Sequence, residues 1–402
     1  MLTFGIVKER KTPPDRRVVF SPEAIKTVTA RFSEIAFKVE PSDIRIFPDQ
    51  AYRDEGIEVT NNLGDCDVLI GVKEVPINQL IPGKKYFFFS HTIKKQPYNR
   101  NLLNAILNKK IELYDHETIV NDQNIRLIGF GYYAGVVGAY NGLRAYGLRH
   151  KSFNLPKAET LASQKELVKE ARQINIPPIK IVVTGKGRVG QGIHELLHAT
   201  GIKEVNPDSF VKENFEVAVF TQLDVLDYYK RKDGVQKDMD DFFKYPEAYK
   251  SIFQKYARVS DIYIAGHFYG EGAPFIFTRK DAKQPEFKIQ VVADVSCDID
   301  GPVASTIRAS TIKDPIYGYD PHKEKEVPFD DPEAITVMAV DNLPCELPAD
   351  ASEGFGEMFL EHVIPAFFNG DENGILERAK ITENGSLTDR FSYLQEYVDG
   401  KE

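Results

Sequence analysis

Cysteine is scarce in this sequence, and long apolar runs are missing from it. The three thiols, Cys66, Cys297 and Cys345, are scattered over 402 residues. Such a set forms neither a disulfide framework nor a zinc site, and we expect buried thiols in a reducing cytoplasm. No apolar stretch approaches the roughly 20 residues that span a bilayer, which argues against a membrane partner.

Blocks of basic residues are also lacking, and the formal net charge is −9. This balance argues against a nucleic acid or an anionic membrane as the partner. Residues 1–7 have the pattern of a first strand rather than of a signal peptide, so we predict a cytoplasmic protein. We find no internal repeat and no low-complexity tract.

The chain does have enough apolar material for two cores. It is 42% hydrophobic and 28% charged over 402 residues, a composition typical of a soluble globular protein with two domains. Short β-branched or aromatic runs alternate with helical stretches. This alternation predicts βαβ units, and therefore an α/β fold with mostly parallel sheets.

The most informative stretch is residues 179–197. It begins with a β-branched run that predicts a buried strand, and it ends with apolar residues at helical spacing. Between them stands the pattern G-x-G-x-x-G, formed by Gly185, Gly187 and Gly190. In a strand, turn and helix of this order the glycines permit a sharp turn and let a pyrophosphate approach the helix N-terminus. We therefore predict a dinucleotide site rather than a plain turn.

In the first half of the chain, polar residues follow several expected strands. We expect strands at residues 4–7, 36–39, 44–47, 67–72, 85–90 and 111–114, and helices at 22–32 and 97–107. Lys73 and Glu74 follow one strand, His91 the next, and Glu117 comes shortly after a third. Ligands of parallel sheets sit at the carboxyl ends of strands, so we expect these side chains to converge.

The second half continues the pattern after a glycine-rich segment. Residues 129–147 predict a helix that connects two domains, and its glycines indicate close packing on another helix or on the cofactor. Beyond it we expect helices at 160–174, 245–256 and 352–368, and strands at 215–224, 261–268 and 289–296. Asp224, His267 and Asp294 lie at the ends of these strands.

Lys73 and His91 each have a plain structural alternative. A lysine after a strand is commonly a solvated rim residue, and a histidine there can be a satisfied core residue. Their position at the ends of neighbouring strands favours a catalytic role. Burial would also lower the pKa of the lysine toward neutrality, so that it could act as a base. Groups of this kind can carry proton steps beside a bound dinucleotide that takes a hydride. We leave His116 and His194 as structural and, seeing no cluster with metal-ligand spacing, predict no metal.

Several segments together resemble saccharopine dehydrogenase of the NAD-dependent, L-lysine-forming type, a family beside alanine dehydrogenase and the transhydrogenase N-terminal half. In the first half these segments are residues 8–22, 71–76, 88–94 and 113–135. In the second half they are residues 185–190, 294–298 and 342–348. The likeness runs in order over nearly the whole chain.

The resemblance implies two Rossmann-like doubly wound domains with an active-site cleft between them. Residues 1–130 plus about 345–402 would form the catalytic domain, and residues 131–344 the NAD-binding domain.

The resemblance also implies roles for side chains of the first domain. Lys73 and His91 would be the acid–base pair, with the division of roles between them open, and Glu74 and Glu117 would tune them. Two arginine forks suited to carboxylates would bind the substrate, namely Arg17 and Arg126.

For the cofactor, NAD, we expect contacts from the glycine turn and from two strand ends. The residues are Gly185, Gly187, Arg188, Val189, Gly190, Asp224 and Asp294. The family's turn can carry a cysteine where this chain has Val189, which excludes a disulfide there. In the family, the acidic residue that binds the cofactor also follows the glycines at a shorter distance along the chain than Asp224 does here. Glu204, nearer the usual distance of about 20 residues from the glycines, is therefore the rival, and NAD against NADP stays open.

The sequence thus predicts an NAD-dependent oxidoreductase that acts on the CH–NH bond of an amino-acid-derived secondary amine. Saccharopine, NAD and water would give lysine, 2-oxoglutarate and NADH. An alanine dehydrogenase and a non-catalytic NAD(H)-binding protein are the alternatives. The expected partner is a small amino-acid substrate, and the protein would be a monomer or a homo-oligomer.

Overall fold

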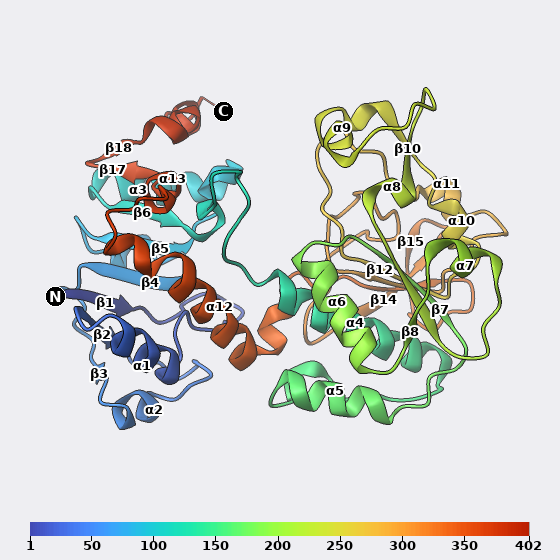
Figure 1. The fold of residues 1–402 in the computed structure, drawn as a ribbon, viewed down its shortest axis with the longest axis horizontal. Helices are drawn as coiled ribbons and strands as arrows, with labels where there is room; N and C mark the ends of the chain where they lie inside the picture. The colour runs from blue at the N-terminus through green and yellow to red at the C-terminus, as the bar shows by residue number, and fades with distance from the viewer. Residues whose placement is uncertain (402) are drawn as a thin grey trace. The chain divides into compact units, whose positions relative to one another are not determined.

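The chain folds into two units, seen in a computed structural model that describes residues 1–401 (Figure 1). The first unit comprises Met1–Phe130 and Pro348–Glu402, and the second comprises Gly131–Leu347. The chain therefore leaves the first unit once and returns to it. Within the described residues no helix is long and apolar enough to cross a membrane.

The first unit is built on a parallel sheet of six strands. Its strands are β1 (Leu2–Ile6), β2 (Ile35–Val39), β3 (Glu58–Val59), β4 (Val68–Lys73), β5 (Lys85–Phe89) and β6 (Glu112–Asp115). Their order is β3-β2-β1-β4-β5-β6, and every pairing is parallel. This is a doubly wound order whose direction reverses between β1 and β4, the point where such sheets bind ligands.

Helices cover both faces of this sheet because successive strand residues point to opposite sides. Phe87 packs on Phe359 of α12 (Pro348–His362), which lies against α1 (Pro22–Arg31). Phe88 points the other way, into a core shared with α3 (Arg100–Asn108) and α14 (Gln395–Val398). Ser21 caps α1 by accepting a hydrogen bond from the Ala24 amide. The remaining elements are α2 (Asp49–Asp54), α13 (Ile375–Ala379), β17 (Thr382–Glu383) and β18 (Ser386–Leu387).

The second unit is built on an eight-stranded sheet of order β15-β14-β16-β13-β12-β7-β9-β8. The strands are β7 (Lys180–Thr184), β8 (Lys203–Glu204), β9 (Val219–Leu223), β12 (Ile262–Ala265), β13 (Val291–Asp294), β14 (Ile316–Asp320), β15 (Lys325–Val327) and β16 (Ile335–Met338). Among the described strands of this sheet, the antiparallel pairings are those of β14 with β15 and of β14 with β16, at one edge. The winding reverses between β7 and β12, which places the loops after these two strands at the ligand position of the sheet.

Two layers of helices enclose this second sheet. One face carries α4 (Gly131–His150), α5 (Gln164–Gln173) and α6 (Arg188–Ala199). The other carries α7 (Pro207–Lys212), α8 (Val225–Tyr228), α9 (Met239–Lys244), α10 (Gln254–Ala257), α11 (Arg279–Ala282) and a hairpin of β10 (Tyr229–Arg231) and β11 (Tyr249–Ser251). As expected from its glycines, α4 packs closely on α6. A Cβ added at Gly135 or Gly192 would lie 2.0 Å from a carbonyl of the other helix.

Two expected elements are wrong. Residues 44–47 are a bend rather than a strand, because Arg45 folds the loop around itself and donates hydrogen bonds to the Glu40 and Phe47 carbonyls. Residues 245–256 are not one helix: a 3-10 turn, the strand β11 and the short α10 divide them. Tyr249, Phe253 and Tyr256 have helical spacing, but they reach the core from different elements. The fold class, α/β with two doubly wound sheets, is confirmed.

Candidate functional site

Lys73 is the last residue of β4, at the reversal point of the first sheet. The side chain of Glu9, from the segment after β1, holds this strand end. Its Oε1 accepts from the Val72 amide at 2.7 Å and its Oε2 from the Lys73 amide at 2.8 Å. The pairing of β4 with β5 is irregular between Ile70 and Lys73, and such irregularities recur next to active sites. Lys73 is thus fixed at the ligand position of the sheet.

Glu9 carries an unusual charge environment. Burial, and then the nearby Asp15, raise the pKa of Glu9 to about 8, so this carboxyl group titrates near neutral pH. Burial alone would raise the pKa of Asp15, but Arg17 and then Lys73 outweigh it and lower that pKa. A carboxyl group that titrates near neutrality in a ligand position is a feature of functional sites.

Arg17 is buried, with 3% of its surface exposed. Its guanidinium donates to Asp15 from Nε at 3.0 Å and from Nη2 at 2.6 Å, and it lies 4.2 Å over the ring of Phe130. We expected Arg17 to bind a carboxylate of the substrate, and in this structure it binds the carboxylate of Asp15. Arg17 fixes Asp15 beside Glu9 and Lys73.

His91 follows β5, the strand next to β4, and lies at the same sheet edge as Lys73. The register pairs Lys73 with Phe89, two residues before His91. His91 has a φ of 54°, a left-handed conformation that is costly for a residue with a side chain and is found at functional sites. The Asp115 carboxylate accepts from its amide at 3.2 Å. The backbone thus places the imidazole at the edge where we expected it.

Glu117 connects the basic groups around His91. Its carboxylate lies 3.4 Å from His91 Nδ1, 3.3 Å from Lys94 Nζ and 3.2 Å from Arg126 Nη2. Burial opposes ionisation, but the His91 hydrogen bond and the charges of Lys94 and Arg126 prevail and lower the pKa of Glu117 from 4.5 to about 2. Glu117 is therefore an ionised partner, and the structure brings it together with His91 and Arg126.

Glu74 and His116 complete this edge of the sheet. Glu74 forms an ion pair of 2.6 Å with Lys11, while its other oxygen, Oε2, is buried without a hydrogen-bond partner among the described residues. His116 is fully buried, and its Nε2 lies 2.9 Å from the Gly71 carbonyl. Burial lowers the pKa of His116 to about 4, so it is neutral at pH 7. His116 is a core residue that packs under the site.

In the second unit, the glycine turn links β7 to α6. Gly185 has a φ of +96°, and a Cβ there would lie 2.5 Å from the Gly266 carbonyl. A Cβ at Gly190 would lie 2.1 Å from the Gly185 carbonyl, so this glycine lets the helix close onto the turn. Gln222 fastens the turn by donating to the carbonyls of Gly185 and Gly190.

The turn leaves space where a pyrophosphate would lie. No described atom comes within 4 Å of a Cβ built at Gly187, which is the N-cap of α6. No side chain among the described residues caps this helix end, and Arg188 and Val189 form its first turn. Amide groups at a helix N-terminus bind anions, so the residues present fit a dinucleotide.

Asp224 and Glu204 lie at different levels of the sheet. Asp224 follows β9, the strand beside β7, and comes directly after the Leu223–Thr184 pair at the carboxyl edge. Glu204 lies on β8 and pairs with Phe220, which is opposite Ile181 near the start of β7. Asp224 is therefore beside the glycine turn, where Lys186 Nζ lies 4.0 Å from its carboxylate, and Glu204 is not.

Asp294, at the end of β13, uses both carboxylate oxygens within the protein. Oδ1 accepts from Ser296 Oγ at 2.6 Å and Oδ2 from Thr306 Oγ1 at 2.6 Å. Burial raises the pKa of Asp294. These contacts make Asp294 an organiser of the loop after β13.

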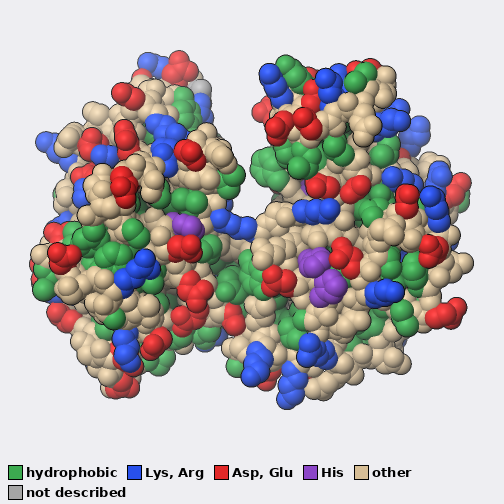
Figure 2. Space-filling model, viewed as in Figure 1, with side chains coloured by type: hydrophobic (Ala, Val, Ile, Leu, Met, Phe, Trp, Pro, Cys, Tyr) green, Lys and Arg blue, Asp and Glu red, His purple; other side chains and the backbone are tan. Residues whose placement is uncertain are grey.

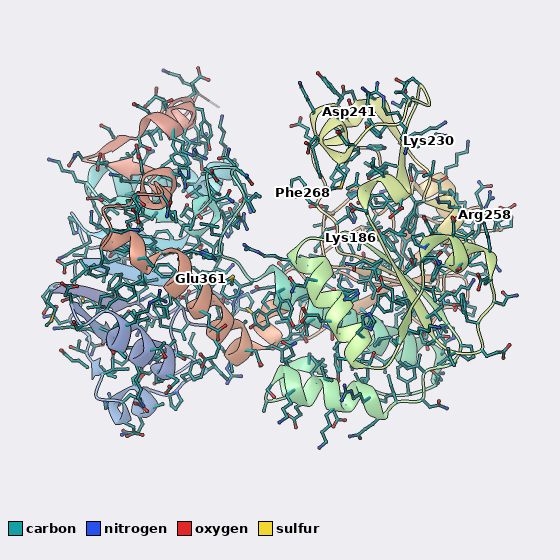
Figure 3. All side chains as sticks on the ribbon, in the orientation of Figure 1. Lys186, Lys230, Asp241, Arg258, Phe268 and Glu361 are labelled. Atoms are coloured by element: carbon teal, nitrogen blue, oxygen red, sulfur yellow. The ribbon has the colours of Figure 1, made fainter. Side chains whose placement is uncertain are left out.

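His267 follows β12, on the other side of the reversal point from the glycine turn. Its Nδ1 lies 2.9 Å from Thr184 Oγ1, while Nε2 is buried without a hydrogen-bond partner among the described residues. Burial lowers the pKa of His267 to about 4. The next residue, Phe268, is 81% exposed, and Figure 3 labels it together with Lys186 of the glycine turn. The two loops at the reversal point thus supply these side chains.

Sequence reasoning missed Glu9 and Asp15 and gave His267 little weight. Glu9 comes shortly after the first strand, so the argument that selected Lys73 applies to it equally. We also expected no histidine or acid cluster with metal-ligand spacing, and this is wrong. His194 and His198 stand one helical turn apart on α6 and share Glu204 as a partner.

Comparisons with known proteins agree with this geometry. Residues 5–137 match the family model "Alanine dehydrogenase/PNT, N-terminal domain". Alpha-aminoadipic semialdehyde synthase, mitochondrial, of Mus musculus is 29% identical over 96% of this chain and 47% of its own length. The chain thus spans about half the length of that relative. Saccharopine dehydrogenase [NAD(+), L-lysine-forming] of Yarrowia lipolytica is 25% identical over 88% of this chain and 89% of its own.

Solved structures show the same fold. An L-alanine dehydrogenase superposes with a TM-score of 0.67 at 15% identity and covers 100% of both chains. A transhydrogenase from Sinorhizobium meliloti has a TM-score of 0.56 at 15% identity, over 96% of this chain and 100% of its own. The resemblance is confirmed as a similarity: the chain is similar to NAD-dependent, L-lysine-forming saccharopine dehydrogenases over most of its length, and residues 5–137 match the model of the N-terminal domain of alanine dehydrogenase and PNT.

Proposed function

We propose that this protein is an NAD-dependent oxidoreductase that acts on the CH–NH bond of saccharopine. Saccharopine, NAD⁺ and water give lysine, 2-oxoglutarate, NADH and a proton. Relatives named for this activity support the proposal, since they match most of this chain and of their own length. The observation that carries it is the position of Lys73 and His91 at one edge of a doubly wound sheet, on neighbouring strands.

The two units divide the work. Met1–Phe130 with Pro348–Glu402 is the catalytic domain, because it holds Lys73, His91 and their partners. Gly131–Leu347 is the NAD domain, because it holds the glycine turn. In that domain the pyrophosphate lies on the N-terminus of α6, and Asp224 bonds the ribose hydroxyls.

Bound NAD supplies the hydride acceptor of the reaction. Lys73 and His91 carry the proton steps: one takes the proton from the substrate nitrogen, and a group of the pair moves protons as water adds to the imine and the amine leaves. Glu117 orients His91 through Nδ1. Glu9 holds the backbone of Lys73, and Asp15 lies close enough to Lys73 for the lysine to lower its pKa.

Substrate carboxylates need cationic partners. Arg126 is suited to this role, since 46% of its side chain is exposed and its pairing with Glu117 fixes its direction. We assign Arg17 to Asp15, which it already binds in a bidentate manner.

A substrate panel read at the NADH absorbance tests the proposal. We expect turnover with lysine plus 2-oxoglutarate and NADH, and with saccharopine and NAD⁺ in reverse. Alanine, and pyruvate with ammonia, test the alanine dehydrogenase alternative, and NADPH is run beside NADH. NADH binding without turnover on any of these pairs would indicate a non-catalytic nucleotide-binding protein. Turnover on alanine alone would replace saccharopine as the substrate.

A further inference from the structure

A histidine pair and a carboxylate meet at the far end of α6 from the glycine turn. His194 and His198 lie one turn apart on this helix, and Glu204 lies on the edge strand β8. Both imidazoles present Nε2 to the same carboxylate oxygen, Glu204 Oε2, at 3.1 Å and 3.5 Å. Figure 2 shows the histidine patch over α6 with an acidic side chain beside it.

Packing holds the two rings in place. Phe220 of β9 contacts both, with ring centroids 5.6 Å from His194 and 5.3 Å from His198 in edge-to-face geometry. The two imidazoles are also edge-to-face to each other, 4.5 Å apart. Each side chain remains a third to a half exposed, at 33% for His194 and 49% for His198. The nitrogen atoms are therefore preorganised and open to solvent.

Two of the separations between the three ligand atoms fit a tetrahedral metal site. Bonds of about 2.0–2.1 Å to zinc at tetrahedral angles put neighbouring ligand atoms about 3.3 Å apart. The two measured nitrogen–oxygen separations, 3.1 Å and 3.5 Å, lie on either side of this value. All three ligand atoms lie within 4.8 Å of one another. An ordinary hydrogen bond accounts for the shorter separation but not for the longer one.

We propose that His194, His198 and Glu204 bind a divalent transition-metal ion of the zinc class, with water as the fourth ligand. Two neutral imidazoles and one carboxylate suit zinc and not magnesium or calcium, which prefer oxygen ligands. The cation also lies near the C-terminus of α6, where the helix dipole favours positive charge.

The site is separate from the dinucleotide position. His194 stands seven residues along α6 from Gly187, which is about 10 Å at 1.5 Å per residue. The ion would tie β8, a two-residue strand at the edge of the sheet, to the helix that bears the glycine turn. Its role is structural, and the inference does not depend on the proposed reaction.

Zinc titration of the full chain tests this site. The protein is stripped with a chelator, dialysed, and titrated with Zn²⁺ by calorimetry, and its melting temperature is recorded with and without the ion. We expect one zinc per chain in the micromolar range or tighter and a higher melting temperature, with no such effect of Mg²⁺. His198→Ala and His194→Ala should each weaken binding at least about tenfold.

His322→Ala is the matched control, because this exposed histidine follows β14 near the opposite edge of the same sheet. It should bind zinc as the unchanged protein does. Far-UV circular dichroism confirms that each variant is folded. Absence of zinc binding by the unchanged protein overturns the proposal. Binding by both α6 variants that is as tight as in the unchanged protein, as the thiols alone would give, also overturns it.

Discussion

At the scale of single residues, Lys73 and His91 carry the catalytic proposal. Loss of one acid–base group typically lowers the rate by roughly 10² to 10⁴. We expect Lys73→Met and His91→Gln each to reduce kcat by about that factor while NADH affinity stays nearly unchanged. The double variant should lose less than the product of the two factors, because the groups act as a unit.

Two exposed side chains serve as controls for this comparison. Lys165→Met on α5 and His322→Gln remove the same chemical groups at exposed positions of the second unit. Both should retain native kcat. Near-native kcat in the Lys73 and His91 variants, measured on the best substrate, would remove the acid–base assignment.

We propose that Asp224 selects NAD over NADP. Its carboxylate would bond the ribose hydroxyls and repel a 2′-phosphate, and Lys186 Nζ lies 4.0 Å from it. Removing the acid leaves that lysine to attract the phosphate. We expect Asp224→Ala to move the ratio of kcat/KM for NADP over NAD upward by about tenfold or more, which is about 1.4 kcal/mol. Glu204→Ala, on the neighbouring strand beside the start of β9 rather than its end, should leave this ratio unchanged. The reverse pattern would transfer the role to Glu204.

Glu117 gives a pH dependence of stability with a defined sign. Its pKa in the folded protein is about 2, below the ordinary 4.5. The ionised carboxylate therefore stabilises the fold at pH above about 4.5, and this contribution is lost as the pH falls toward 2. Glu117→Gln should lower the free energy of unfolding by about 1–3 kcal/mol at pH 7.

Urea unfolding at pH 7 and at pH 3 measures this effect. The difference in stability between Glu117→Gln and the unchanged protein should shrink at pH 3. Glu34→Gln, a substitution at an exposed glutamate of the same unit, is the control and should show no such difference. A Glu117 effect of equal size at both pH values would show that packing and not ionisation is responsible.

At the scale of elements, we propose that the glycine turn and the N-terminus of α6 together bind the pyrophosphate. Gly187 has open space around it, so Gly187→Val should fold normally, and its side chain would occupy the pyrophosphate position. We expect its NADH affinity, followed by fluorescence titration, to fall by at least about tenfold. Gly190→Val would instead meet the Gly185 carbonyl and should destabilise the fold. A folded Gly187→Val protein with normal NADH affinity would place the cofactor elsewhere.

The elements also show what local patterns predict well. The strands that precede Lys73, His91 and the glycine turn are runs of buried apolar residues bounded by turns, so their assignment does not depend on distant contacts. The prediction of one helix over residues 245–256 was wrong, because aromatic residues at helical spacing also suit a hairpin strand followed by a short helix. Spacing alone cannot separate these, since the partner strand β10 lies about twenty residues earlier in the chain.

At the scale of the whole molecule, the two units differ in their continuity along the chain, since the first is made of two segments and the second of one. The second unit, Gly131–Leu347, is continuous in sequence and has its own sheet with a core on each face. Domains of this kind can fold alone. We expect an excised fragment of residues 131–347 to unfold cooperatively and to bind NADH without turning over any substrate. The control is the same fragment with Gly187→Val, which should lose NADH binding. A folded fragment that binds no NADH would contradict the assignment of this unit to the cofactor.

Local apolar patterns and glycine spacing are enough to predict the two sheets, the glycine turn and the strand ends that carry Lys73, His91 and Glu117. The contacts of those side chains follow only from the folded chain. Glu9 reaches the end of β4 from a different segment, Arg17 binds Asp15, and Glu117 unites His91 with Arg126. Sheet register likewise separated Asp224 from Glu204 and brought Glu204 to the histidines of α6. Arg17 and Asp15 are neighbours in the chain, but Glu9 is 64 residues from Lys73 and Glu117 is 26 residues from His91, so no local pattern encodes these contacts.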